Sequence, residues 1–203
     1  DGPSAPALAD VAFTRALGRA QARQRRALLA RDPAELMTAL RGGRATGDFR
    51  GAVPRHPSEV VFLFSGHGAE YVEMGTELYR FEPVFRTQID RCAAVLTPIL
   101  GFDPRDELFP TAARVEEAAQ RMKQFIVSQP LMFMFQYSLA QLLLSWGIKP
   151  AAVGGYSSGE YVAACLAGIF SLEDALRLVA ERGRLMQKVP PGAMLSVRAT
   201  EAR

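Results

Sequence analysis

One serine lies where a nucleophile would be expected. The stretch from Ala151 to Gly168 reads AAVGGYSSGEYVAACLAG, in which a short apolar run gives way to a glycine-bracketed turn and then to apolar residues at helical spacing. The pattern G-x-S-x-G between a strand and a helix is typical of a nucleophile elbow, a sharp turn that exposes the serine Oγ. It predicts Ser157 as the nucleophile, with Ser158 as the weaker candidate one step into the turn.

A serine nucleophile also needs donors for the oxyanion that forms during acyl transfer. The backbone N–H of Ser158, which follows the nucleophile, is one expected donor. We expect the second from the loop Gly66-His67-Gly68, which follows the apolar run 59–64. Both loops follow predicted strands, and the carboxyl ends of parallel strands meet at one edge of a sheet.

The base that would activate the serine is harder to find, because the chain has two histidines, His56 and His67. His56 falls in an expected linker. His67 is better placed, at a strand end, yet a histidine between two glycines is more often an exposed polar residue. The residues alone leave the base open, because a base is recognised by its distance from the proton it removes.

Three arginines bear on which acyl group the serine would carry. Arg177, Arg182 and Arg184 lie on an amphipathic helix expected over residues 172–188. Most arginines on such a helix are solvated. One that points toward the nucleophile would bind a carboxylate through two parallel hydrogen bonds, which suits an acyl group with its own free carboxylate, such as malonyl.

Hydrophobic spacing predicts the elements that position these residues. Strands are expected at residues 59–64 and 150–154, and helices at 74–81, 83–100, 114–122, 130–146, 160–166 and 172–188. A further strand is expected to start at residues 193–197, after Pro190, Pro191 and Gly192 end the last helix. Strands that alternate with helices predict an α/β fold with a parallel sheet. We expect the larger domain to be an incomplete, α/β-hydrolase-like subdomain.

Residues 1–57 read as a separate, smaller α/β domain that precedes a larger one at residues 58–203. We expect a helix at residues 8–17, a strand at 26–30 and a helix that begins at Pro33 with Asp32 as its cap. The basic, glycine-rich stretch 42–56 is typical of a loop that closes this unit.

Composition excludes several classes of protein. The chain has 203 residues, of which 49% are hydrophobic and 22% charged, with a formal net charge of +3. These values are typical of a folded domain, and no apolar run reaches the roughly 18 residues that span a bilayer. The arginines of residues 19–26 alternate with alanine rather than with stacking aromatics, which disfavours nucleic acid as a partner.

The two cysteines and the N-terminus bear on the cellular compartment. Cys92 and Cys165 lie in apolar helical surroundings, and the N-terminus has no secretory pattern. We therefore expect buried thiols without a disulfide, no metal site and a cytoplasmic protein.

Taken together, the motifs resemble those of the acyltransferase domains of modular type I polyketide synthases, a family related to malonyl-CoA:acyl-carrier-protein transacylases. Phe64–Glu70 resembles the family's F-P-G-Q-G-S/A-Q, and Ser128–Pro130 its T/A-Q-P. Gly155–Gly168 resembles G-H-S-x-G-E-Y-x-A-A-x-x-A-G, and Phe170–Met186 follows F-S-L-E-D-A-L-x-L-V-x-x-R-G-x-L-M. Leu8–Leu17 is similar to a helix of the linker between the ketosynthase and acyltransferase domains.

The resemblance implies roles for these residues. Ser157 would be acylated from an acyl-CoA and pass the group to the phosphopantetheine arm of an acyl carrier protein, with no other cofactor bound. Arg182 falls on the arginine that holds the malonyl carboxylate, and Gln129 on a residue that lines the pocket. The backbone amides of His67 and Ser158 match the oxyanion hole. The implied partners are the carrier protein, malonyl-CoA or a related acyl-CoA, and the neighbouring ketosynthase.

Three departures from the family pattern matter. Tyr156, expected at the substrate-binding site, replaces the usual histidine before the nucleophile, and His67 replaces a glutamine. The family's general-base histidine and small ferredoxin-like subdomain lie beyond Arg203. We therefore expect the chain to represent the N-terminal half of an acyltransferase, inactive alone, and to end on the first strand of that subdomain.

Two alternatives to the acyltransferase stay open. A serine esterase or thioesterase shares the elbow and differs in its acceptor, which is water. A vestigial acyltransferase that serves as a structural or docking module would fit Tyr156, His67 and the absent base. The joint presence of Ser157, Arg182 and the glycine loops favours an enzyme, because a site needs several convergent groups. The choice between malonyl and methylmalonyl is not predicted.

Overall fold

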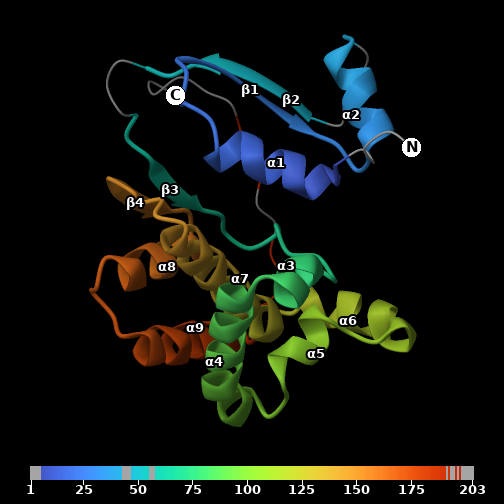
Figure 1. Cartoon of the computed structure of the whole chain (residues 1–203). Helices are drawn as coiled ribbons and strands as arrows, with labels where there is room; N and C mark the ends of the chain where they lie inside the picture. Colours follow the sequence, from blue (N-terminus) through green and yellow to red (C-terminus); the bar gives the residue numbers. More distant parts are fainter. Residues whose placement is uncertain are drawn as a thin grey trace. The chain divides into compact units, whose positions relative to one another are not determined.

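A computed structural model describes residues 6–42, 47–54 and 58–190, together with residues 192, 195 and 197. Two compact units make up the chain, residues 1–58 and 59–203. Figure 1 shows the elements of both along the sequence. His56 lies outside the described residues. Of the strand expected at 193–197, only Leu195 and Val197 are described.

The first unit pairs two strands with two helices. Its elements are α1 (Leu8–Leu17), β1 (Gln24–Leu29), α2 (Pro33–Leu40) and β2 (Gly47–Ala52). The two strands are antiparallel, with Arg26 opposite Arg50. Asp32 caps α2 as expected, its Oδ1 accepting the Glu35 N–H at 2.8 Å.

The prediction of a loop over residues 42–56 is wrong where β2 forms. Glycines and charges disfavour a strand, but pairing with β1 outweighs them. Asp48 lies between two arginines: it accepts from Arg26 Nε at 2.9 Å and from Arg50 Nη2 at 2.8 Å. These hydrogen bonds hold the pKa of the Asp48 carboxyl well below its usual range.

The second unit contains a short parallel sheet covered by helices. Its strands are β3 (Val61–Phe64) and β4 (Ala152–Gly155), paired in parallel with Phe64 opposite Gly155. The helices are α3 (Thr76–Phe81), α4 (Pro83–Leu100), α5 (Pro104–Leu108), α6 (Val115–Met122), α7 (Phe125–Ser145), α8 (Gly159–Leu166) and α9 (Leu172–Met186), with a 3₁₀ turn at Ala112–Arg114 before α6. The predicted α/β class with parallel strands is confirmed.

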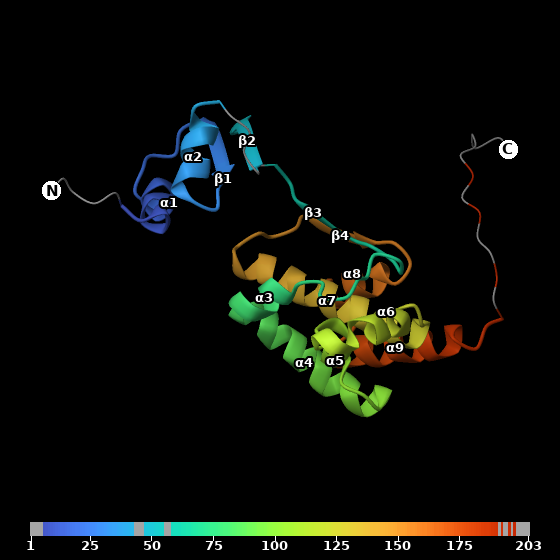
Figure 2. The ribbon, with the colours of Figure 1, turned by 90° about the vertical axis from the view of Figure 1, so that its right-hand side faces the viewer.

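Helix α7 forms the centre of this unit. Figures 1 and 2 both show it between the β3–β4 pair on one side and α4 and α9 on the other. Because α7 has neighbours on several sides, apolar residues surround its axis, including the fully buried Leu131, Phe133 and Met134. Within the described residues, no helix has both the length and the apolar character that a membrane span requires.

The second unit differs from the prediction at the start of α7 and in an additional short helix. Helix α7 begins at Phe125, five residues before the predicted start at Pro130, so the proline lies inside it. Contacts with α9 stabilise this extra turn, in which the Phe125 N–H donates to Gln187 Oε1 at 2.8 Å. The short helix α5 was not predicted; Asp103 caps it by accepting the Arg105 N–H at 2.9 Å.

Candidate active site

Ser157 lies in a strained turn between β4 and α8. Its φ is +54°, in the left-handed region that costs a residue with a side chain free energy. The turn is held by main-chain bonds, in which Tyr156 N–H donates to Phe64 O at 2.9 Å and Glu160 N–H to Ser157 O at 3.2 Å. Ser157 is exposed to solvent. This geometry is that of a nucleophile elbow.

The motif glycines are required by close approach of main chain to main chain. A Cβ on Gly155 would lie 2.2 Å from the carbonyl carbon of Gly159, and a Cβ on Gly159 would lie 2.3 Å from Phe64 O. Neither distance is compatible with a side chain. The turn can therefore fold back against the end of β3 only with glycine at both positions.

A second loop lies beside the serine, because β3 and β4 are parallel and end at the same edge. A Cβ on Gly66 would lie 3.0 Å from Tyr156 O and 3.2 Å from Ser157 Cβ. The N–H groups of His67 and Ser158 donate to no acceptor within the described parts of the chain. Two free backbone donors near a serine Oγ are what an oxyanion hole needs.

The side chain of Ser158 is not available as the nucleophile. Ser158 is 3% exposed, and its Oγ is buried without a hydrogen-bond partner in the described structure. Ser157, by contrast, is exposed at the turn. The structure therefore favours Ser157 and leaves Ser158 with its backbone N–H.

Arg182 of α9 reaches the nucleophile. Its Nη2 donates to Ser157 Oγ at 3.3 Å, and its Nη1 donates to the buried Gln129 Oε1 of α7. The guanidinium also stands over the ring of Tyr161, 5.6 Å from its centroid. Three residues expected at the site, Ser157, Gln129 and Arg182, are thus brought together from three elements.

The other two arginines of α9 do not reach the site. Arg184 is exposed and pairs with Glu181, its Nε donating to Oε2 at 2.8 Å. Arg177 is exposed on the same helix. A guanidinium beside a nucleophile is suited to bind a carboxylate on the acyl group.

Gly183 allows α9 to pack closely against the start of α7. A Cβ on Gly183 would lie 2.5 Å from Phe125 O, so any other residue would push the two helices apart. Gly183 follows Arg182 directly. The close packing of α9 on α7 therefore sets the distance between Arg182 and Gln129.

Two residues of the site were not predicted from the sequence. Tyr161 lies four residues after Ser157, one helical turn further, and that spacing was the available signal. Gln136 lies seven residues after Gln129 on α7, which places both on one face of the helix. Its Nε2 donates to Ser65 O and to Ser65 Oγ, both at 2.9 Å.

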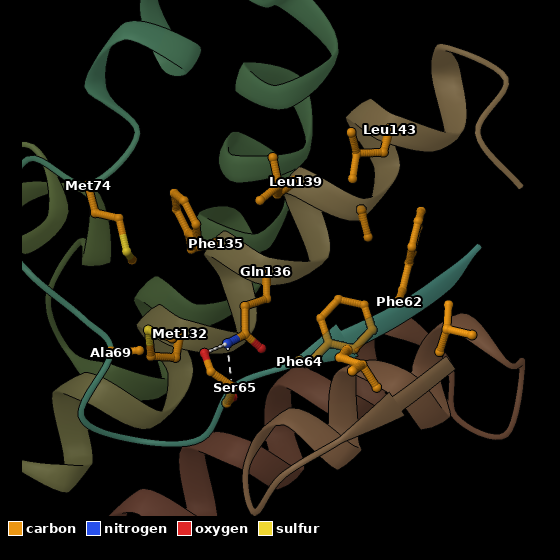
Figure 3. A pocket seen from close by; sticks show the side chains of 13 residues that line it. Phe62, Phe64, Ser65, Ala69, Met74, Met132, Phe135, Gln136, Leu139 and Leu143 are labelled. Carbon is orange, nitrogen blue, oxygen red and sulfur yellow. Dashed lines mark hydrogen bonds between the residues drawn. The ribbon is translucent and has the colours of Figure 1, made fainter. Parts of the chain in front are cut away.

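Figure 3 shows this pair at one side of an apolar cavity of about 430 Å³ between β3 and α7. Met132, Phe135, Leu139 and Leu143 of α7 line it. Ser157, Gln129 and Arg182 do not. The cavity is therefore not where an acyl group on Ser157 would bind. What matters for the site is that Gln136, at the edge of the cavity, fixes Ser65 by hydrogen bonds.

The side chains of His67 and Tyr156 have different surroundings. His67 Nδ1 lies 2.9 Å from Glu70 Oε1, and its ring packs on Phe125 with centroids 4.8 Å apart. It makes no hydrogen bond to Ser157 within the described structure. Tyr156 is 71% exposed, beside Gly66. In the described part of the chain, His, Cys, Asp and Glu side chains form no group of three that could hold a metal.

The family and its curated members are identified by sequence comparison. The sequence model described as acyl transferase domain matches residues 61–203. One component of the phenolphthiocerol/phthiocerol polyketide synthase of Mycobacterium tuberculosis (strain ATCC 25618 / H37Rv) is 44% identical over 151 residues, which cover 74% of this chain and 10% of that protein. Polyketide synthase GfsB of Streptomyces halstedii is 38% identical over 198 residues, 95% of this chain and 3% of that protein.

Solved structures of acyl transferases also match this chain. The acyl transferase domain of ZmaA matches with a TM-score of 0.86 at 43% identity, over 94% of this chain and 43% of that one. MCAT from Streptococcus pneumoniae matches with a TM-score of 0.56 at 35% identity, over 64% of this chain and 39% of that one. The chain therefore spans less than half of these solved chains and 10% or less of the two synthase proteins.

Proposed function

This chain belongs to the acyl transferase domain family of modular type I polyketide synthases, and we propose that it moves a malonyl-type group from coenzyme A to an acyl carrier protein. The observation that carries the proposal is the 3.3 Å contact between Arg182 Nη2 and Ser157 Oγ. A guanidinium beside the nucleophile suits an acyl group that ends in a carboxylate, and acetyl or fatty acyl groups lack a carboxylate.

The reaction we propose has two halves through one covalent intermediate. Ser157 Oγ attacks the thioester carbonyl of malonyl-CoA and loses its proton to a base. The oxyanion that forms accepts from the N–H groups of His67 and Ser158. It collapses with cleavage of the C–S bond, and coenzyme A leaves as the thiol with that proton. The phosphopantetheine thiol of the carrier protein then gives its proton to the base and attacks the ester; the C–O bond to Ser157 breaks, and Ser157 Oγ takes up that proton.

Each side chain has a separate task in this scheme. Arg182 binds the carboxylate of the acyl group, and Gln129 fixes the guanidinium through its Oε1. The exposed Tyr156 forms a wall of the substrate-binding site beside Gly66. His67 makes no hydrogen bond to Ser157 within the described residues, and the resemblance to the family implies that the base is a histidine beyond Arg203. The first unit, residues 1–58, is proposed as part of the linker to a neighbouring ketosynthase domain.

Acyl loading measured by intact mass tests the proposal. Malonyl-CoA, methylmalonyl-CoA and acetyl-CoA are offered to this chain and to the same polypeptide continued past Arg203, each with a Ser157→Ala control. We expect a malonyl or methylmalonyl adduct on the continued polypeptide alone, absent from the Ser157→Ala variant. The preferred acyl-CoA then identifies the substrate.

The same samples separate the alternatives. Loading followed by transfer to a carrier protein supports the acyltransferase. Loading followed by hydrolysis, without transfer, supports a thioesterase. If neither polypeptide loads any of the three acyl groups, the proposal is wrong and a structural or docking module takes its place.

A further inference from the structure

A largely buried carboxylate holds the loop beside the nucleophile. Residues 65–70, here called the glycine loop, follow β3 and pass next to Ser157. Glu70 Oε2 accepts the Gly68 N–H at 2.7 Å, and Glu70 Oε1 lies 2.9 Å from His67 Nδ1. The Glu70 side chain is only 7% exposed, so water competes little for these contacts. One carboxylate therefore holds both the side chain of His67 and the peptide that follows it.

Packing alone does not fix the glycine loop. A cavity of about 510 Å³ adjoins it, lined by His67, Gly68 and Glu70 and by residues at the end of α6, among them Met122 and Lys123. Atoms in a close-packed interior are fixed by neighbours on all sides, whereas a loop against a cavity can shift. The polar contacts of Glu70, together with the packing of the His67 ring on Phe125, therefore limit the movement of the peptide between His67 and Gly68 on this side.

The sequence departs from its family at both ends of this contact. The motif F-P-G-Q-G-S/A-Q has glutamine where this chain has His67 and again where it has Glu70. A glutamine pair is neutral and offers amide donors and acceptors. Here both have been replaced, by an imidazole and a carboxylate 2.9 Å apart. The two replacements are complementary, since the carboxylate accepts what the imidazole N–H donates.

We propose that Glu70 is a positioning residue, which acts through His67 and Gly68 to hold the His67 N–H where it stabilises the oxyanion on the acyl group. The inference rests on the proposed function, because the N–H needs an oxyanion to serve. Gln136 secures the other end of the glycine loop through Ser65. The His67 side chain thus serves to hold the loop through Glu70, and the group of His67 that acts in the reaction is its backbone N–H.

A double-mutant cycle on the continued polypeptide tests the coupling. The variants are Glu70→Ala, Glu70→Gln, His67→Gln and the pair His67→Gln/Glu70→Gln, which restores the family's residues. Glu77→Gln, an exposed carboxylate of α3, is the matched control. Each variant is assayed for the maximal rate of malonyl loading and for the malonyl-CoA concentration that gives half of it.

We expect Glu70→Ala to lower the maximal loading rate by about 10- to 100-fold, because a misplaced oxyanion donor acts on the transition state. The half-saturating concentration should not change, since the donor adds little to ground-state binding. Each single glutamine variant should be slower than the wild type, and the double variant should recover to within about threefold of it. If Glu70 had a purely structural role, Glu70→Ala would instead lower the melting temperature, without a selective loss of the maximal loading rate at an unchanged half-saturating concentration.

Hydrogen exchange of the backbone amides in the glycine loop supplies a readout that needs no turnover. We expect the Gly68 amide to exchange at least about tenfold faster in Glu70→Ala than in Glu77→Gln. Unchanged exchange, or wild-type loading by Glu70→Ala, would overturn the inference. If Glu70→Ala does not fold, Glu70→Gln and the double variant decide it.

The two proposals can fail separately. If the wild type loads no acyl group, the proposed function fails, while the amide exchange still decides whether Glu70 holds the loop. If the wild type loads malonyl and the double variant is no faster than its slower single variant, the proposed function stands and the inference about Glu70 is wrong.

Discussion

At the scale of single residues, the conformation of Ser157 shows how stability is given up for a site. A left-handed φ of +54° costs a residue with a Cβ roughly 1–2 kcal/mol, and glycine avoids this cost. Main-chain bonds on both sides of the turn enforce the conformation. The strained turn is what exposes the Ser157 Oγ to solvent, and interactions elsewhere in the fold offset its cost.

This strain can be measured by comparing two substitutions that both remove the hydroxyl. Ser157→Gly relieves the strain and Ser157→Ala keeps it. We expect Ser157→Gly to have the larger free energy of unfolding, by about 1 kcal/mol, even though glycine gains entropy in the unfolded chain. Urea titrations of both variants check this. Equal midpoints, or a more stable alanine variant, would show that the turn is not strained.

Arg182 carries the prediction about substrate choice. Arg182→Ala should slow malonyl loading by about 10- to 150-fold, which corresponds to the loss of a charge-assisted hydrogen bond of roughly 1.5–3 kcal/mol. Acetyl loading should fall less, so that discrimination between the two acyl groups narrows. Arg182→Lys should recover only part of the rate, because an ammonium cannot bind a carboxylate at two points in one plane.

Arg184→Ala is the matched control for this test, since Arg184 lies on the same helix, is exposed and pairs with Glu181. It should load malonyl at the wild-type rate. Equal losses for malonyl and acetyl in Arg182→Ala would mean that the guanidinium does not recognise a carboxylate.

At the scale of elements, local sequence patterns predicted the helix bounds and helix caps that are determined by residues of the element itself. Helix α1 has the predicted bounds, and Asp32 caps α2 as its type and position suggested. Apart from the short helix α5, the errors occur where the structure depends on partners distant in the sequence. Strand β2 forms because β1 pairs with it, and the first turn of α7 forms because α9 packs against Phe125.

The contact between α7 and α9 gives a prediction about stability. Gly183→Ala should destabilise the second unit by about 1–3 kcal/mol, because its Cβ would lie 2.5 Å from Phe125 O. The clash must exceed the gain of roughly 1 kcal/mol that alanine brings to a helix. The same change should slow malonyl loading, since it moves Arg182 away from Gln129.

Gly51→Ala is the control for that substitution, because a Cβ there meets no atom within 4 Å. It should change the free energy of unfolding by less than about 0.5 kcal/mol. Thermal and urea unfolding of the two variants make the comparison. A Gly183→Ala variant as stable as Gly51→Ala would mean that the helices separate at no cost.

At the scale of the whole molecule, the second unit brings residues of the site together from distant parts of the sequence. The motifs predicted Ser157 and left three arginines open, and the resemblance to a family selected Arg182 and added Gln129. Their distances depend on how α7, α8 and α9 pack around one core, which no local pattern contains. The contact between His67 and Glu70 was not predicted either: the two residues are three apart, but they lie in a loop, where spacing does not fix which side chains meet.

The core contains a titratable thiol, Cys92, so the pH dependence of stability reports on whether the core excludes water. Cys92 of α4 is fully buried, and burial raises the pKa of its thiol from near 9 to about 12. The folded state therefore binds the thiol proton more tightly than the unfolded chain does. This contribution to stability is complete below pH 9, and it is lost as the pH rises from 9 toward 12, by up to about 1.4 kcal/mol per pH unit.

Urea unfolding at several pH values between about 8 and 10.5, at constant ionic strength, tests this slope against a Cys92→Ala variant. Removal of the thiol should lower stability at about pH 8 by about 1 kcal/mol, since a small cavity is left. Above about pH 9 the curves should converge and then cross before about pH 10.5, because only the wild type still loses stability through Cys92. Burial also raises the pKa of Tyr79, Tyr137 and Cys165, and these groups are present in both proteins, so their effects cancel in the difference. Parallel curves would mean that the thiolate of Cys92 is tolerated in the folded core, and that α4, α7 and α9 open to water there.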